Sequence, residues 1–341
     1  MERFLKSRYR IGEKISENPF SVTYKGLFIS NGKPVIIKIY KRGTLNSRLI
    51  NQMKQKVRQL SAINHHGIAK LIDGDYGWQG FYYVREYIEG HSLGELLAGK
   101  RQLEVEKALD IVVEVCRALE VVHQQGIIHG GIKPTNIFID SQGLVRVSDF
   151  IIEGEIKEAM PQKVFSLMMN GRYLAPEELT GVAASVSADI YALGLVLLEM
   201  VEPALGFKDE GLKGGLLKLK KNWLLSSEKF LALPRYLQSI ISRALEKDLL
   251  LRFPAVNYFR ESLEQKRLVL PPLAQEELVD IFENTVTRYG QVEIIEETEG
   301  LEDVGQVKIR WGSEKHRTWI LGIVLTLALF SGLFYAFLAG R

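Results

Sequence analysis

The spacing of the apolar residues changes partway along the chain, and this change limits the folds that the chain can adopt. Residues 9–40 and 81–88 contain runs rich in Val, Ile, Tyr and Phe that are separated by turn residues, which predicts β-strands. From about residue 104 the apolar residues recur at helical spacing, as at Ala108, Ile111 and Val115. The pattern predicts an α+β protein in which a small β-rich lobe precedes a larger helical lobe.

The composition argues against several classes of protein. The 341 residues carry a net charge of only +3, so the sequence gives no indication of nucleic-acid binding through bulk electrostatics. The single cysteine, Cys116, excludes an intrachain disulfide and fits a reducing compartment. It lies in an apolar helical stretch, where a small core residue is expected. The N-terminal residues lack the apolar run of a signal peptide.

A long apolar segment lies near the C-terminal end of the sequence. Residues 319–339 carry no charge, and as a helix they would be about 31 Å long, close to the thickness of a hydrocarbon core. We expect a single transmembrane helix here, and a buried core helix is the alternative. Lys and Arg residues at 308–317 precede the segment and only Arg341 follows it, so the positive-inside rule predicts a cytoplasmic N-terminal domain with a tail anchor.

Small residues recur every four positions along this apolar segment, at Ala328, Gly332, Ala336 and Gly340. Small residues at this spacing let two membrane helices approach closely. Homodimerisation through this face is therefore one expectation. The other is that small residues are simply frequent in membrane helices.

The predicted domain ends near residue 268, and residues 269–318 are expected to form a juxtamembrane linker. Within it, residues 274–289 have the pattern of an amphipathic helix, and residues 291–303 are acidic. The sequence GQVEI at 290–294 is echoed by GQVKI at 305–309, which indicates a small hairpin. A solvated linker without regular structure is the alternative.

Several short motifs follow one another in a fixed order between residues 9 and 266. They are HGGIKPTNIFID at 129–140, VSDF at 147–150, Ala175-Pro176-Glu177, Asp189 in SADIYALG and Arg252 in LEKDLLLRF. Their order and spacing resemble the protein-kinase superfamily, and the compact loops are most similar to bacterial serine/threonine kinases. The resemblance implies a two-lobed kinase fold over residues 9–268, with an N-lobe at about 9–86 and a C-lobe at about 87–268. It also implies a bacterial source.

The resemblance assigns structural roles to a set of residues that are present here. It implies that Asp189 supports the backbone of the catalytic loop and that Arg252 pairs with Glu177. It also implies an apolar column that runs through both lobes and contains Leu60, Leu71, His129 and Phe150. Because these residues match the family, we expect an ordered, stably folded domain.

The catalytic loop departs from the family pattern at its centre. The position of the catalytic base is Gly131, which has no side chain to accept a proton, and loss of a general base typically costs about 10²–10⁴ in rate. Gly130 replaces the arginine that binds a phosphorylated activation loop, and Lys133 remains without a carboxylate to assist. No catalytic residue is therefore expected.

The phosphate-binding loop of the family is also altered. The pattern GxGxFGxV falls on residues 16–23, and Ser16, Asn18 and Ser21 occupy its three glycine positions. A Cβ at these positions hinders the approach of backbone amides to a phosphate, and Pro19 removes one amide donor. The loop is therefore expected to bind phosphate poorly.

The lysine and the metal ligands of the family persist in part. Lys38 matches the strand lysine, but its helix-glutamate partner falls on Lys56, and no Asp or Glu occurs between residues 46 and 72. Two ammonium groups about 4 Å apart would repel each other, so Lys38 is expected to pair with Asp149. Asn136 and Asp149 occupy the two positions that hold magnesium in the family. Asp149 is expected either to bind a metal ion or, the preferred interpretation, to hold Lys38 structurally.

The adenine pocket of the family is filled by larger side chains in this sequence. Ile36 replaces the small alanine above the ring, Phe138 lies below it, and Arg85 occupies the gatekeeper position just before the hinge residue Glu86. We expect the domain to hold a closed shape without a nucleotide.

Together these features favour a catalytically impaired kinase-like module, a pseudokinase, with a regulatory or scaffolding role on the cytoplasmic face of the cell membrane. Its partners are the lipid bilayer, through residues 319–339, and a protein that the sequence does not identify; no cofactor is expected. One alternative is a weak or unconventional serine/threonine kinase that uses ATP and Mg²⁺ through Lys38, Asn136 and Asp149. Another is a nucleotide sensor without catalysis.

Overall fold

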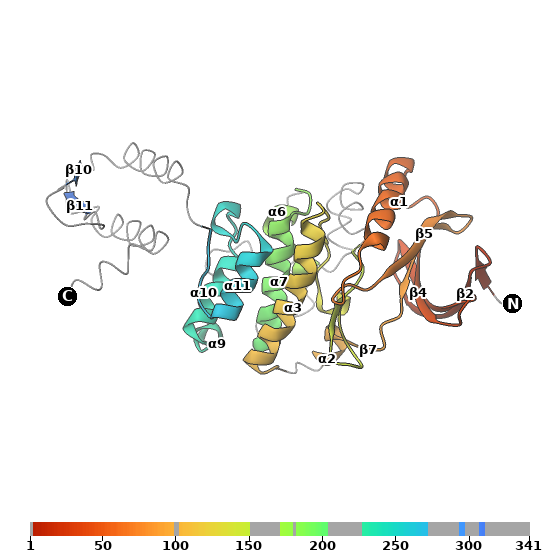
Figure 1. Cartoon of the computed structure of the whole chain (residues 1–341), viewed down its shortest axis with the longest axis horizontal. Coiled ribbons are helices and arrows are strands. Elements are labelled where there is room, and N and C mark those ends of the chain that lie inside the picture. Colours follow the sequence, from red (N-terminus) through yellow and green to blue (C-terminus); the bar gives the residue numbers. More distant parts are fainter. Residues whose placement is uncertain are drawn as a thin grey trace. The chain divides into compact units, whose positions relative to one another are not determined.

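The computed structural model describes residues 3–98, 102–150, 171–179, 182–203 and 227–271, together with the backbone of two short strands near the C-terminus. The chain divides into two compact units, Met1–Val269 and Leu270–Arg341. The first unit contains a β-rich N-lobe followed by a helical C-lobe (Figure 1), so the predicted order of the two lobes is confirmed.

The N-lobe is built on a six-stranded antiparallel sheet of order β1-β2-β3-β4-β6-β5. Its strands are β1 (Arg3–Leu5), β2 (Tyr9–Glu17), β3 (Ser21–Phe28), β4 (Pro34–Tyr40), β5 (Leu71–Gly77) and β6 (Gly80–Glu86). Alternation along β4 places Val35, Ile37 and Ile39 in a hydrophobic cluster with Tyr9 and Tyr82. The intervening side chains of β4 therefore face the other side of the sheet, where the candidate site lies.

One helix, α1 (Ser47–Ala62), packs against this sheet. The side chain of Asn46 caps it by accepting a 2.9 Å hydrogen bond from the backbone N–H of Leu49. The helix approaches β5 so closely that a Cβ on Gly74 would lie 2.7 Å from Cγ2 of Val57. Glycine at position 74 therefore allows the contact between helix and sheet.

The C-lobe is mainly helical and is arranged around α7 (Val186–Val201), most of whose residues are buried. Helices α3 (Val105–His123), α10 (Arg235–Ala244) and α11 (Val256–Gln265) pack against α7. The shorter helices are α2 (Leu93–Leu96), α6 (Pro176–Leu179) and α9 (Glu228–Leu231), with 3₁₀ turns at η1 (Pro134–Asn136), η2 (Gly171–Tyr173) and η3 (Leu249–Leu251). A small sheet of order β7-β8-β9 joins β7 (Gly90–Ser92), β8 (Ile137–Asp140) and β9 (Val145–Val147).

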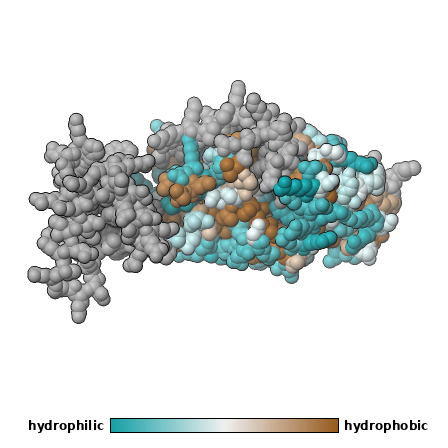
Figure 2. Space-filling model, turned by 90° about the horizontal axis from the view of Figure 1, so that it is seen from above, coloured by the Kyte–Doolittle hydropathy of each residue, from teal (hydrophilic) through white to brown (hydrophobic). Residues whose placement is uncertain are grey.

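The surface of the described residues differs between the two lobes. Seen from above, the N-lobe is mainly hydrophilic, whereas more hydrophobic residues are visible over the C-lobe (Figure 2). Residues 3–86 contain 16 Lys and Arg but only 5 Asp and Glu, so the polar surface of the N-lobe is strongly basic.

A buried ion pair between Arg252 and Glu177 connects distant parts of the C-lobe. The guanidinium of Arg252 donates to both carboxylate oxygens of Glu177, at 2.8 and 3.1 Å, and also to the backbone carbonyls of Ser187 and Glu246. The side chain of Arg252 is fully buried. Glu177 supplies the negative charge that compensates the buried guanidinium.

The second unit contains an antiparallel pair, β10 (Glu293–Glu296) and β11 (Val307–Arg310), in which Glu293 is opposite Arg310. The pairing that the echoed sequences indicated is therefore present. Within the described residues, no helix is both long enough and apolar enough to cross a membrane. The amphipathic helix predicted at 274–289 and the transmembrane helix predicted at 319–339 lie outside the described residues.

We expect Glu177→Ala to lower the free energy of unfolding by about 3–5 kcal/mol, because it leaves the buried Arg252 guanidinium without its carboxylate. Urea unfolding followed by circular dichroism measures the change. Glu106→Ala, which removes the partner of Lys266 at the surface, is the matched control and should have a much smaller effect. Equal losses in the two variants would contradict the structural role of the buried pair.

Candidate functional site

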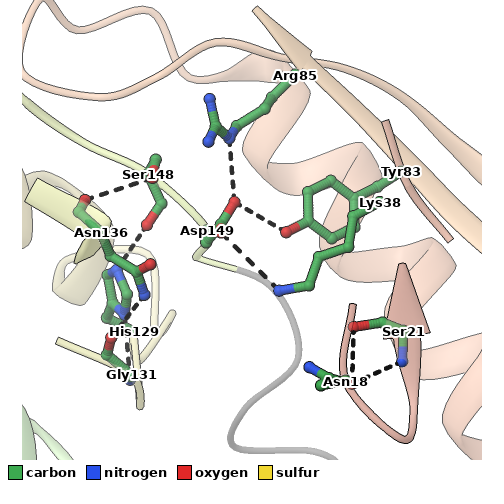
Figure 3. Close-up of polar contacts among 10 residues, drawn as sticks. All are labelled: Asn18, Ser21, Lys38, Tyr83, Arg85, His129, Gly131, Asn136, Ser148 and Asp149. Carbon is green, nitrogen blue, oxygen red and sulfur yellow. Dashed lines mark hydrogen bonds and ion pairs between the residues drawn. The ribbon is translucent and has the colours of Figure 1, made fainter. Parts of the chain in front are cut away.

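The candidate site lies between the two lobes, where Asp149 follows β9 (Figure 3). Oδ1 of Asp149 accepts hydrogen bonds from the hydroxyl of Tyr83 at 2.9 Å and from Nε of Arg85 at 3.0 Å. Its Oδ2 lies 3.9 Å from Nζ of Lys38. These three partners belong to β4 and β6, so one carboxylate of the C-lobe contacts two strands of the N-lobe.

The surroundings of Asp149 keep its carboxylate ionised. Burial by itself raises the pKa of Asp149, but the positive charges of Arg85 and Lys38 and the hydrogen bond from Tyr83 outweigh it, so this pKa lies well below its usual range. Burial and the Asp149 charge both raise the pKa of Tyr83 well above its usual value. The Tyr83 hydroxyl therefore remains protonated and acts as a donor.

Arg85 makes contacts on several sides, although only 8% of its side chain is exposed. Besides its bond to Asp149, a terminal nitrogen of the guanidinium donates to the backbone carbonyl of Glu86 at 3.1 Å. The guanidinium carbon lies 5.6 Å from the centre of the Phe138 ring, within the range of a cation–π contact. Ile36, on β4 next to Arg85, is buried as well. The guanidinium therefore lies among the residues that the sequence predicted to fill the adenine pocket.

Lys56, which stands at the helix-glutamate position of the family, contacts the C-lobe. Its Nζ donates to the backbone carbonyl of Ile128 at 3.3 Å, just before the catalytic loop. This contact links α1 of the N-lobe to the C-lobe. The bond joins residues 72 positions apart in the chain, so no local pattern in the sequence indicates it.

The turn between β2 and β3, at the position of the phosphate-binding loop, satisfies its own amides. Oδ1 of Asn18 accepts from the backbone N–H of Phe20 at 2.9 Å and from that of Ser21 at 2.7 Å. The N–H of Asn18 itself donates to the carbonyl of Ser21, and Pro19 has no N–H. The side chain of Asn18 thus accepts hydrogen bonds from the same backbone amides that would donate to a bound phosphate.

The catalytic loop keeps a well-defined backbone. The carboxylate of Asp189 on α7 accepts from the backbone N–H groups of His129 at 2.9 Å and Gly130 at 2.8 Å, and it also contacts His123 at 2.9 Å. Burial raises the pKa of Asp189, but the hydrogen bond with His123 and the other contacts lower it overall. Gly130 has a φ of +68°, a conformation that glycine adopts at little cost.

His129 packs against Phe150, another residue of the predicted apolar column. Its Nε2 contacts the carbonyl of Ser148 at 3.0 Å, and its Nδ1 accepts from the N–H of Gly131 at 3.1 Å. Because a carbonyl only accepts and an N–H only donates, the proton is placed on Nε2 and the ring is neutral. The ring centre lies 4.6 Å from that of Phe150, and Phe150 lines one small cavity together with Leu60 and Leu71.

The base position offers only backbone atoms. The carbonyl of Gly131 accepts a 2.9 Å hydrogen bond from Nδ2 of Asn136, whose side chain is buried. Lys133 lines the same cavity as Gly130 and Gly131. Among these residues of the loop, no carboxylate stands where a substrate hydroxyl would lose its proton.

Asn136 and Asp149 are the residues here that match magnesium ligands. Both oxygens of Asp149 already face donors or positive charges, and the amide nitrogen of Asn136 faces Gly131. A divalent cation would have to displace Arg85 or Lys38 or lie close to their charges. The described residues form no cluster of three or more His, Cys, Asp or Glu side chains that suits a metal. The site as arranged does not fit Mg²⁺.

Sequence reasoning identified Lys38, Arg85 and Asp149 but missed Tyr83 and the role of Asn18. Tyr83 lies two positions before Arg85 on β6, and alternation along a strand therefore puts both side chains on one face. An Asn at the start of a tight turn followed by Pro is the signal that would have indicated the side-chain cap at Asn18.

Comparison with known proteins gives consistent results. The model of the protein kinase domain matches residues 9–263. The chain is 29% identical over 246 residues to the serine/threonine-protein kinase PrkC of Bacillus subtilis, covering 72% of this chain and 38% of that protein. It is 27% identical over 265 residues to a probable serine/threonine-protein kinase of Clostridium perfringens, covering 77% of this chain and 39% of that protein.

A further relative is the serine/threonine-protein kinase PknA of Mycobacterium tuberculosis, which is 30% identical over 213 residues, 61% of this chain and 49% of PknA. The matches thus span less than half the length of these relatives. Among solved structures, Rad53 in complex with AMP-PNP matches with a TM-score of 0.57 and 20% identity, over 77% of this chain and 66% of that chain, which shows the shared fold. The chain belongs to the protein kinase family and is related to bacterial serine/threonine kinases.

Proposed function

We propose that this chain is a catalytically impaired protein kinase domain that acts as a regulatory or scaffolding module on the cytoplasmic face of a membrane. The observation that carries the proposal is the catalytic loop. Asp189 and His129 hold the backbone of this loop, yet position 131 contributes only backbone atoms: its N–H donates to His129 and its carbonyl accepts from Asn136. A loop that keeps its shape without its base supports a role in binding other molecules rather than in phosphoryl transfer.

Two further features support this proposal. The turn at Asn18 leaves no backbone N–H of residues 18–21 without an acceptor, so it has no donors prepared for phosphate oxygens. Lys38 pairs with Asp149 instead of a helix glutamate. The alternative of a weak kinase requires Lys38, Asn136 and Asp149 to leave their present partners and bind Mg-ATP.

We expect the full chain, incubated with radiolabelled ATP and Mg²⁺, to incorporate no more label than Asp149→Asn, because the base and the phosphate cradle are both missing. Gly131→Asp, which restores only the base carboxylate, should remain equally inactive. Autophosphorylation and labelling of a general protein substrate are the readouts. Labelling by the unmodified chain that Asp149→Asn abolishes would establish the weak-kinase alternative instead.

The stability that Asp149 contributes should depend on pH. Its pKa is lower in the folded protein than in the unfolded chain, so its contribution is fully present above about pH 5 and is lost as the pH falls toward the folded pKa. The difference in unfolding free energy between the unmodified chain and Asp149→Asn should be smaller by about 1 kcal/mol at pH 3 than at pH 7. Urea titrations at the two pH values measure it. A difference that does not change with pH would contradict the ion-paired state.

The membrane location is part of the same proposal and rests on residues 319–339. We expect the full chain to remain with membranes after washing at high salt, whereas a chain without residues 319–341 is released. Removal of the acidic residues 291–303 is the matched control and should not release the protein. Recovery of the full chain in the soluble fraction would contradict the anchor. Self-association through Ala328, Gly332, Ala336 and Gly340 is a further part of the proposal.

A further inference from the structure

The structure points to a specific role for Arg85. We propose that its guanidinium is a built-in ligand of the interlobe cleft, which connects the two lobes where other members of the family would hold a nucleotide. This inference rests on the proposed function and identifies the Arg85 guanidinium as the group that occupies the cleft. The cleft would then bind a planar cation rich in N–H donors, and Arg85 of the same chain supplies that cation.

The contacts of Arg85 are those of a bound ligand. The guanidinium covers the ring of Phe138, the residue expected beneath an adenine, with 5.6 Å between the guanidinium carbon and the ring centre. One terminal nitrogen donates to the hinge carbonyl of Glu86, at 3.1 Å. A flat group that lies over an aromatic ring and donates to the hinge would compete with an adenine for the same space.

The other edge of the guanidinium faces the C-lobe. Nε of Arg85 donates to Asp149 at 3.0 Å, and Tyr83 from the same strand donates to the same carboxylate oxygen at 2.9 Å. The two strand residues thus hold a carboxylate that belongs to the other lobe (Figure 3). Since both Arg85 and Asp149 are largely buried, little solvent screens this ion pair.

The composition of the cleft explains why an arginine, and not a lysine, suits this position. A guanidinium provides five N–H donors in a rigid plane, so it can contact the carboxylate, the hinge carbonyl and the aromatic ring together. A lysine ammonium is a compact charge without a flat face. Lys38 already supplies such a charge at 3.9 Å from Asp149, so Arg85 adds the planar contacts.

Removing the Arg85 side chain tests the proposal, because it leaves a cavity lined by a carboxylate, a carbonyl and an aromatic face. In the full chain, Arg85→Ala should lower the melting temperature by roughly 5–15 °C, since it leaves Asp149 with fewer partners. Ethylguanidinium at millimolar concentration should restore part of that loss in a dose-dependent manner, as expected for a ligand that binds only the folded state. Ethylammonium, which carries the charge without the plane, should restore much less.

Two controls complete the experiment. Arg48→Ala, at the exposed face of α1, should leave the melting temperature nearly unchanged and show no response to ethylguanidinium. Arg85→Lys keeps the positive charge, so it should fold even if Arg85→Ala does not, and it should melt between Arg85→Ala and the unmodified chain. Mg-ATP should not raise the melting temperature of the unmodified chain.

The proposal is overturned if Arg85→Ala or Arg85→Lys melts like the unmodified chain, if ethylguanidinium affects Arg85→Ala and Arg48→Ala equally, or if Mg-ATP stabilises the unmodified chain in a saturable manner. These outcomes differ from those that test the proposed function. Phosphotransfer by the unmodified chain would contradict impaired catalysis, whereas normal stability of the Arg85 variants would contradict only the internal ligand.

Discussion

The carboxylate of Asp149 is the point at which the two lobes are joined at the candidate site. It comes from the segment after β9 and is held by Tyr83, Arg85 and Lys38, which all belong to the N-lobe sheet. The bond from Lys56 on α1 to the carbonyl of Ile128 adds a second connection nearby. Because a buried carboxylate is stable only when its charge is compensated, this arrangement favours a fixed relation between sheet and helices.

The residues that maintain the fold are separate from those that would carry out the reaction. Asp189 and His129 fix the catalytic loop through backbone groups, so their contacts do not depend on the side chains at positions 130 and 131. The backbone of the loop is therefore compatible with glycine at both positions. This independence explains how a member of the kinase family can keep the two-lobed architecture while Gly131 occupies the base position.

The polar groups that would contact a nucleotide have partners within the protein. Asn18 accepts from the turn amides, Arg85 donates to the hinge carbonyl, and Asp149 accepts from three N-lobe side chains or lies close to their charge. Satisfied polar groups are costly to expose, so a ligand would have to replace each of these bonds.

The sequence by itself determined the order of strands and helices and the identity of the altered positions, because the spacing of apolar residues and the motif order depend on local sequence. It also indicated that Lys38 would turn to Asp149, since no acidic residue was available on α1. Only the tertiary structure decided that Lys56 contacts Ile128 and that Arg85 lies over Phe138 against the hinge. Some of these contacts join residues more than 50 positions apart, and others depend on the rotamers that side chains adopt within the packed cleft. Local periodicity of the sequence determines neither the long-range contacts nor the rotamers.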